Sequence, residues 1–158
     1  MSNNPLAIPI NNMQAALDRI APDTLRLLGT QAVNDSKENF RRQGFAGVPW
    51  QQRKNDKDTG RAILIGKGSG HLKNSIHIVG YGSNKVTIGT GNLPYAKAHN
   101  EGFKEEVYVR SKLGTNHPGH YMKMNLHKRQ YMGMTPTLKA DIKKIIQSQL
   151  AQVFKILK

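Results

Sequence analysis

Histidines are the side chains in this sequence best suited to catalysis or metal binding, because it holds six of them and no cysteine. The absence of cysteine excludes disulfides, thiolate zinc sites and cysteine nucleophiles. His117 and His120 are separated by a proline and a glycine, so no helix presents both to one metal ion. His71 and His77 stand on either side of an expected turn, and no His-Glu-x-x-His motif occurs. The sequence therefore predicts neither a metal site nor a cofactor.

Other patterns of catalytic residues fail on their spacing. No Gly-x-Ser-x-Gly turn is present, and the few acidic residues form no paired-carboxylate site. The glycine-rich run 66–70 resembles a phosphate-binding loop. However, five residues instead of four separate Gly60 from its Gly-Lys pair, and a glycine follows the lysine where that loop needs Ser or Thr. A catalytic His99 or Glu101 is the alternative, but neither has a partner at fixed spacing. We expect a protein that is not an enzyme.

Residues 89–102 form the best-defined stretch of the sequence. Gly89 releases the chain from a strand, and Pro94 suits the first turn of a helix, where its missing N–H would have no partner. Gly102 can end this helix in the left-handed conformation. One helical face carries Tyr95, Ala98 and His99. We interpret the stretch as a packing corner between a strand and a short helix.

The remaining strands follow from alternating apolar residues and turn residues. Residues 75–81 and 86–90 predict a β-hairpin, with 82–85 as its connection. Residues 107–109 and 121–132 predict further strands, and Glu105 and Glu106 are typical of charges that protect a strand edge.

Helices are expected at both ends of the chain. A short helix over 13–20 is interrupted at 21–23, and a longer one runs from Pro22 to about Gln43. Residues 135–137 cap a final helix that reaches about Leu157. Together these elements predict an α+β domain, with an antiparallel sheet and hairpin core packed against N- and C-terminal helices.

The chain of 158 residues suits one domain. We expect residues 1–12 to form a flexible arm and 13–158 the domain. No apolar run is long enough to span a membrane, and the start of the chain lacks a secretion signal, so a cytoplasmic site of synthesis is expected. The net charge of +14 favours polyanions such as DNA, although solubility alone is an alternative explanation. Trp50 lies in a polar loop, where it either pins the loop to the core through its indole N–H or stacks on a base.

The order of these motifs resembles the phage virion morphogenesis family, the tail-completion proteins of tailed bacteriophages such as Mu. The resemblance covers residues 22–155 and rests on the tryptophan loop, a Gly-His-Leu-Lys-Asn-Ser-Ile stretch, a Gly-Thr pair, and Pro-Tyr-Ala-Lys-Ala-His-Asn-Glu-Gly at 94–102. The family's Pro-Ala-Arg-Pro segment is replaced at 127–130 and has lost both prolines. The residues that would define the fold are Gly89, Pro94, Tyr95, Ala96, His99, Gly102, Arg129, Tyr131 and Gly133.

The resemblance implies a structural protein that completes the tail and joins it to the head, in the virion's neck. Such subunits form homo-oligomeric rings, here expected to be a hexamer, around the DNA channel and contact the head connector and tail tube proteins. Loops 44–60 and 103–121 would be contact arms. Candidate contacts with DNA or with another subunit are Arg41, Arg42, Arg53, Lys54 and Lys57. The alternative is a small basic module that binds nucleic acid without sequence preference.

Overall fold

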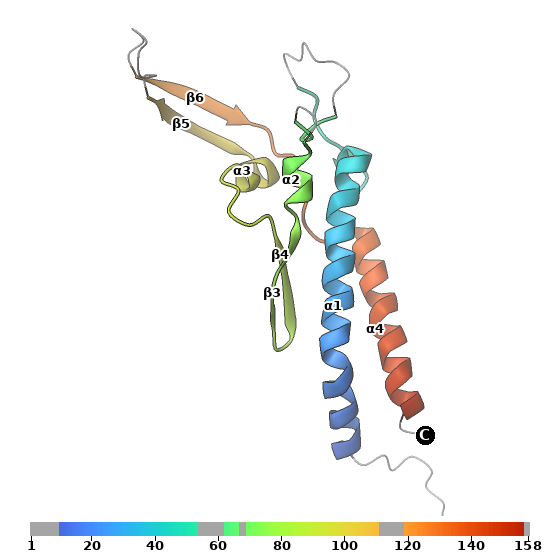
Figure 1. Cartoon of the computed structure of the whole chain (residues 1–158). Coiled ribbons are helices and arrows are strands. Elements are labelled where there is room, and N and C mark those ends of the chain that lie inside the picture. The colour runs from blue at the N-terminus through green and yellow to red at the C-terminus, as the bar shows by residue number, and fades with distance from the viewer. Residues whose placement is uncertain (1–9, 54–61, 67–68, 111–118, 157–158) are drawn as a thin grey trace, which may run out of the picture.

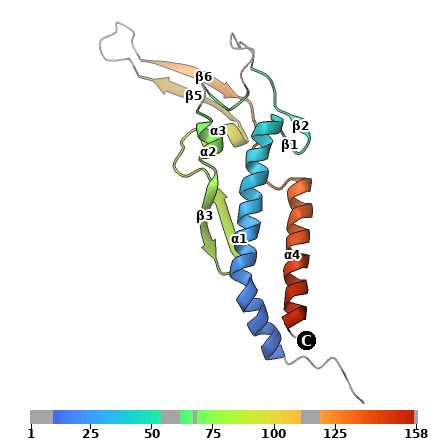
Figure 2. The same cartoon turned by 45° about the vertical axis from the view of Figure 1, so that its right-hand side comes forward.

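The computed structural model describes residues 10–53, 62–66, 69–110 and 119–156, and its class is α+β, as predicted. Two long helices, α1 (Ile10–Arg42) and α4 (Pro136–Ile156), lie side by side and run in opposite directions (Figure 1). A β-hairpin packs on another side of α1, and a second hairpin projects away from both helices (Figures 1 and 2). The first nine residues of the expected arm lie outside the described residues, and α1 already begins at Ile10.

Helix α1 is continuous through Pro22, so the predicted break at residues 21–23 was wrong. Proline has no N–H to give to the preceding turn, which ordinarily breaks or kinks a helix. Here Leu17 and Leu25, on either side of the proline, line one groove with Ile146 and Leu150 of α4. The packing of α1 against α4 and the β3–β4 hairpin therefore offsets the local cost of the proline.

The start of α4 confirms the predicted cap. The Thr135 hydroxyl accepts the backbone N–H of Leu138 at 3.0 Å, and Pro136 is the first helical residue. The same hydroxyl donates to the buried carboxylate of Asp35 on α1, also at 3.0 Å. A side-chain bond from Gln31 to Asp141 (2.8 Å) adds a second link between the helices. The cap thus fixes the beginning of α4 against α1.

Strands β3 (His77–Gly82) and β4 (Lys85–Gly89) form the predicted hairpin. Its inner face lies against Gly29 of α1. A Cβ atom at Gly29 would stand 2.7 Å from Val86 Cγ2 and 2.9 Å from Ile78 Cδ1. Only a glycine therefore allows the hairpin to approach the helix this closely.

The described strands form three separate two-stranded antiparallel ladders instead of one continuous sheet. Besides the hairpin, β1 (Gly44–Phe45) pairs with β2 (Val48–Pro49), and β5 (Phe103–Val109) pairs with β6 (His120–Leu126). Strand β5 begins earlier than predicted. Strand β6 ends at Leu126 and not at Met132, because the segment after it leaves the ladder and enters the core.

The core lies at the C-terminal end of α1, where the short helices α2 (His71–Asn74) and α3 (Ala96–Glu101) meet the Trp50 loop (Figure 1). Its buried members come from segments far apart in the sequence: Phe40, Trp50, Ile63, Leu72, Ile76, Ala96 and Tyr131.

Candidate contact surfaces and the family of the chain

The corner at residues 89–102 closes around Tyr131, whose side chain is completely buried. The Tyr131 hydroxyl donates a hydrogen bond to the backbone oxygen of Ala96 at 3.0 Å, and its ring centroid lies 5.2 Å from that of Phe40. Burial raises the pKa of the Tyr131 phenol, so it stays protonated and remains a donor. Ala96 and Tyr131 therefore join two segments that lie far apart in the sequence.

Asn100 makes a second connection that sequence reasoning missed. Its side-chain oxygen accepts the backbone N–H groups of both Tyr131 and Met132, each at 3.0 Å. The face of α3 that meets this segment thus carries Ala96 and Asn100, four residues apart, whereas Tyr95 on the predicted face is 40% exposed. An asparagine inside a short helix gave no signal of this role, because its partners are thirty residues further along the chain.

The glycines and Pro94 support the corner from outside the core. Gly102 ends α3 as predicted, but its φ of 85° and ψ of 165° place it outside the predicted left-handed helical conformation, in another positive-φ region that glycine favours. Gly133 has φ 151°, and a Cβ atom there would stand 2.6 Å from the Gln130 amide nitrogen. Pro94 is exposed in the turn before α3, and a Cβ atom at Gly89 would approach Val79 Cγ2 to 2.8 Å.

Trp50 pins its loop to the core, as the first of its two predicted roles requires. Its indole N–H donates to the backbone oxygen of Gln130 at 2.8 Å, and its ring packs edge-on against Phe40 at 5.5 Å. Only 5% of Trp50 is exposed, which leaves no ring face on which a base could stack.

His99 lines a cavity of about 330 Å³ together with His71, Tyr95, Arg53 and Arg129. Burial, and then the positive charge of Arg129, lowers the pKa of the His99 imidazole. Its Nδ1 atom is buried and has no hydrogen-bond partner among the described residues. The Tyr95 ring packs edge-on against the His99 imidazole, with 5.9 Å between the ring centroids, and the Tyr95 hydroxyl lies 2.9 Å from His71 Nδ1. No carboxylate or serine hydroxyl is paired with His99 in the described structure, so the predicted alternative of a catalytic His99 gains no support.

Arg129 has a structural role in this cavity wall. The residue is 7% exposed. Its Nε donates to the backbone oxygen of Gln51 at 3.1 Å, and its backbone N–H donates to the backbone oxygen of His99 at 2.8 Å. Burial, followed by the charge of Arg53, lowers the pKa of the Arg129 guanidinium. These bonds hold the Trp50 loop, α3 and the segment after β6 together.

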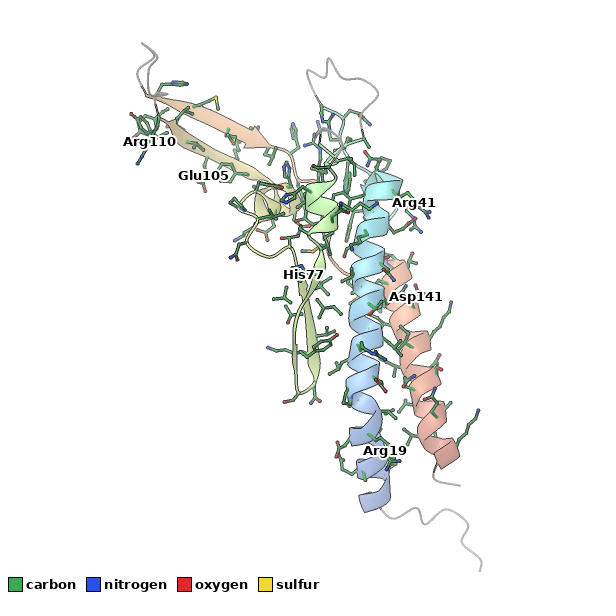
Figure 3. All side chains as sticks on the ribbon, viewed as in Figure 1. Arg19, Arg41, His77, Glu105, Arg110 and Asp141 are labelled. Atoms are coloured by element: carbon green, nitrogen blue, oxygen red, sulfur yellow. The ribbon has the colours of Figure 1, made fainter. Side chains whose placement is uncertain are left out.

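Arg41 and Arg42, two of the predicted contact residues, lie exposed at the C-terminal end of α1, and Figure 3 shows Arg41 there. Both bind the Glu38 carboxylate, at 2.7 Å from Arg41 and 3.0 Å from Arg42. The hydrogen bond from Arg41 lowers the pKa of Glu38. Their position also complements the negative end of the helix dipole.

Arg53, the other predicted contact residue that the structure describes, lies apart from this pair. Arg53 donates to the backbone oxygen of Ala62 at 3.1 Å and lines the His99 cavity, whereas Arg42 lines a different one beside the β1–β2 turn. Lys54 and Lys57 lie outside the described residues.

Within the described residues, the predicted contact arm at 103–121 consists mainly of β5 and the beginning of β6 (Figure 1). Several large apolar side chains of this ribbon are exposed: Tyr108, Val109, Tyr121, Met122 and Met124. Strands were predicted here at 107–109 and from 121 onward, and the part of β5 before Val107 was missed because its charged residues hid the alternation.

The described parts of the chain contain no cluster of three metal-binding side chains and no helix long and apolar enough to cross a membrane. No curated protein and no solved structure matches the chain. Residues 9–151, most of its length, match the phage virion morphogenesis family. The chain therefore belongs to the phage virion morphogenesis family, whose members build the bacteriophage virion.

Proposed function

We propose that this chain is a structural subunit that completes the phage tail and helps join it to the head, as part of a ring around the DNA channel. The role requires no catalysis. Its partners would be further copies of the chain, with a hexamer as the expected ring, together with the head connector and tail tube proteins at the neck of the virion.

One structural observation carries this proposal beyond family membership. The β5–β6 ribbon stands clear of the two helices and the core, and several of its apolar side chains are exposed (Figures 1 and 2). Exposed apolar surface on a projecting element is typical of a protein whose burial is completed by its neighbours. The high net charge of +14 suits a subunit that lies close to DNA without reading its sequence.

The proposal is tested with a phage whose gene for this chain carries a nonsense mutation. Filled heads and separate tails should accumulate, and electron microscopy should show few joined particles. Adding the purified protein to that extract should restore joined, infectious particles. Particles that join normally without the chain, or a block before heads or tails are made, would contradict the proposal.

A further inference from the structure

The β5–β6 ribbon has one apolar face and one polar face. Residues directly opposite each other in an antiparallel ladder share a face, and side chains alternate along each strand. The pairing therefore gathers on one face the residues Phe103, Glu105, Val107, Val109, His120, Met122, Met124 and Leu126. The opposite face carries Lys104, Glu106, Tyr108, Tyr121, Lys123 and Asn125.

This apolar face lacks a covering layer in the described structure. Met122 and Met124 are 43% and 39% exposed, and both views show the ribbon pointing away from α1 and α4 (Figures 1 and 2). An isolated two-stranded ribbon is only marginally stable in water, because it needs a third strand or a packed layer. A second surface is therefore needed to hold the ribbon in place.

The negative charge of Glu105 limits which surface can cover the apolar face of the ribbon. Glu105 stands opposite Met124, between Phe103 and Val107, and makes no ion pair within the described residues. Glu106, on the polar face, lies 3.6 Å from Lys123 and thus has a partner. Covering the Glu105 carboxylate with apolar surface alone would cost several kcal/mol, so the surface that covers this face of the ribbon must bring a positive charge. A second copy of this basic chain can supply one.

A matching surface lies at the other end of the molecule. A groove of about 350 Å³ between α1, α4 and the β3–β4 turn is lined by apolar side chains that include Leu17, Ile20, Leu25, Ile146 and Leu150. Ile146 and Leu150 are 40% and 39% exposed, and the apolar stripe continues to Phe154, which is 54% exposed. Methionines, being flexible and unbranched, are well suited to fill such an irregular groove.

A lysine beside the groove can supply the positive charge that Glu105 lacks. The exposed Lys143 lies one turn before Ile146 on α4, at the spacing that places two side chains next to each other. Lys143 lies outside the lining of the groove, whereas the Asp18 carboxylate lines it and accepts a hydrogen bond from the Gln14 side chain at 2.9 Å. The apolar stripe and its adjoining lysine thus complement the apolar face and its carboxylate.

We propose that the apolar face of the β5–β6 ribbon of one copy docks into the α1–α4 groove of a second copy. The ribbon and the groove lie at opposite ends of α1, so a chain cannot fill its own groove (Figure 1). A contact between two different surfaces is heterologous, and repeating it builds a closed ring or an open chain. The proposal rests on the proposed function and supplies the subunit contact that a ring requires.

Disulfide cross-linking between two single variants tests this contact, because the natural chain has no cysteine. Met122→Cys places a thiol on the apolar face, and Leu150→Cys places one in the groove. Tyr121→Cys, on the opposite face of the same strand and 72% exposed, is the matched control. Mixing Met122→Cys with Leu150→Cys under oxidising conditions should give a mixed disulfide dimer, and Tyr121→Cys with Leu150→Cys should give several-fold less. Phe154→Cys replaces Leu150→Cys if the latter fails to fold.

The other outcomes overturn the proposal. Equal yields from Met122→Cys and Tyr121→Cys would mean random collision, and a dominant dimer of Met122→Cys alone would mean that two ribbons meet each other. A ribbon thiol that cross-links in assembled virions only to a different virion protein would identify that protein as the occupant. Absence of the mixed dimer, combined with normal rescue of head–tail joining, would remove this contact and leave the proposed function intact. If the purified wild-type chain failed to restore head–tail joining in the mutant extract, the proposed function itself would be wrong.

Discussion

Asn100 is a side chain that holds the corner around Tyr131 directly. Asn100→Ala would leave the backbone N–H groups of Tyr131 and Met132 without an acceptor. Each unsatisfied donor costs roughly 1–3 kcal/mol when it is shielded from water, so for two donors we expect a loss of about 2–6 kcal/mol in the free energy of unfolding. Urea unfolding followed by the fluorescence of Trp50 measures this loss. Lys97→Ala, at an exposed position of the same helix, should change stability little, and a loss equally small for Asn100→Ala would contradict the assignment.

Asp35 predicts a pH dependence at the start of α4. Burial is the main cause that raises the pKa of its carboxyl above the ordinary value of 3.8, against the opposing effect of the bond from Thr135. The folded state therefore binds this proton more tightly than the unfolded state does. The stability that the protonated form contributes is fully present below pH 3.8 and is lost as the pH rises through the folded-state pKa.

Asp35→Asn carries no charge at any pH and should escape this loss. The difference in unfolding free energy between the variant and the wild type should therefore rise with pH across that window and become constant above it. Urea unfolding from pH 3 to 7 measures the difference, with Asp23→Asn at an exposed carboxylate of α1 as the control. A difference that falls as the pH rises would show that the Thr135 bond outweighs burial.

At the scale of elements, Gly29 sets how the β3–β4 hairpin approaches α1. Gly29→Ala would raise helix propensity by about 1 kcal/mol, but its Cβ atom would collide with Val86 and Ile78, and overpacking costs about 1–3 kcal/mol. We expect a net loss of stability in the wild-type background. In Val86→Ala, where the nearer methyl group is removed, the same substitution should cost less or stabilise. The unfolding free energies of the wild type, the two single variants and the double variant measure the coupling between the two positions. If Gly29→Ala stabilised the wild type by the full helix-propensity difference, the predicted collision would be refuted.

The elements that could be predicted from the sequence are those whose signals are local. The β3–β4 hairpin alternates every second residue, Gly102 ends α3, and Thr135 with Pro136 begins α4, each within a few residues. The failures involve distant partners. Pro22 stays inside α1, where residues before and after it line a groove together with residues of α4. Asn100 binds a segment that lies thirty residues further along the chain. Strands at 107–109 and from 121 onward were predicted, but the beginning of β5 was missed because Glu105 interrupts its apolar alternation.

At the scale of the whole molecule, the net charge is +14, but two of the arginines predicted to contact DNA are paired with an acidic residue. Arg41 and Arg42 both bind Glu38, and the buried Trp50 cannot stack on bases. We therefore expect the isolated protein to bind duplex DNA weakly and without sequence preference, with a dissociation constant in the range of about 10⁻⁴–10⁻⁶ M at physiological salt. Tight binding by the isolated wild-type chain would favour the nucleic-acid-binding module instead.

Glu38→Gln decides whether this arginine pair belongs to a DNA-contacting surface. The substitution releases both guanidinium groups, so it should tighten DNA binding. The affinity should also fall more steeply as salt rises, with a slope that corresponds to up to about two additional phosphate contacts. Glu101→Gln removes the same charge at an exposed carboxylate near Lys97 and controls for net charge alone. Fluorescence anisotropy with a labelled duplex across a salt series measures both variants. If the two carboxylates give equal effects, the attraction comes from the charge of the whole molecule, and Arg41 and Arg42 serve only to complement the end of α1.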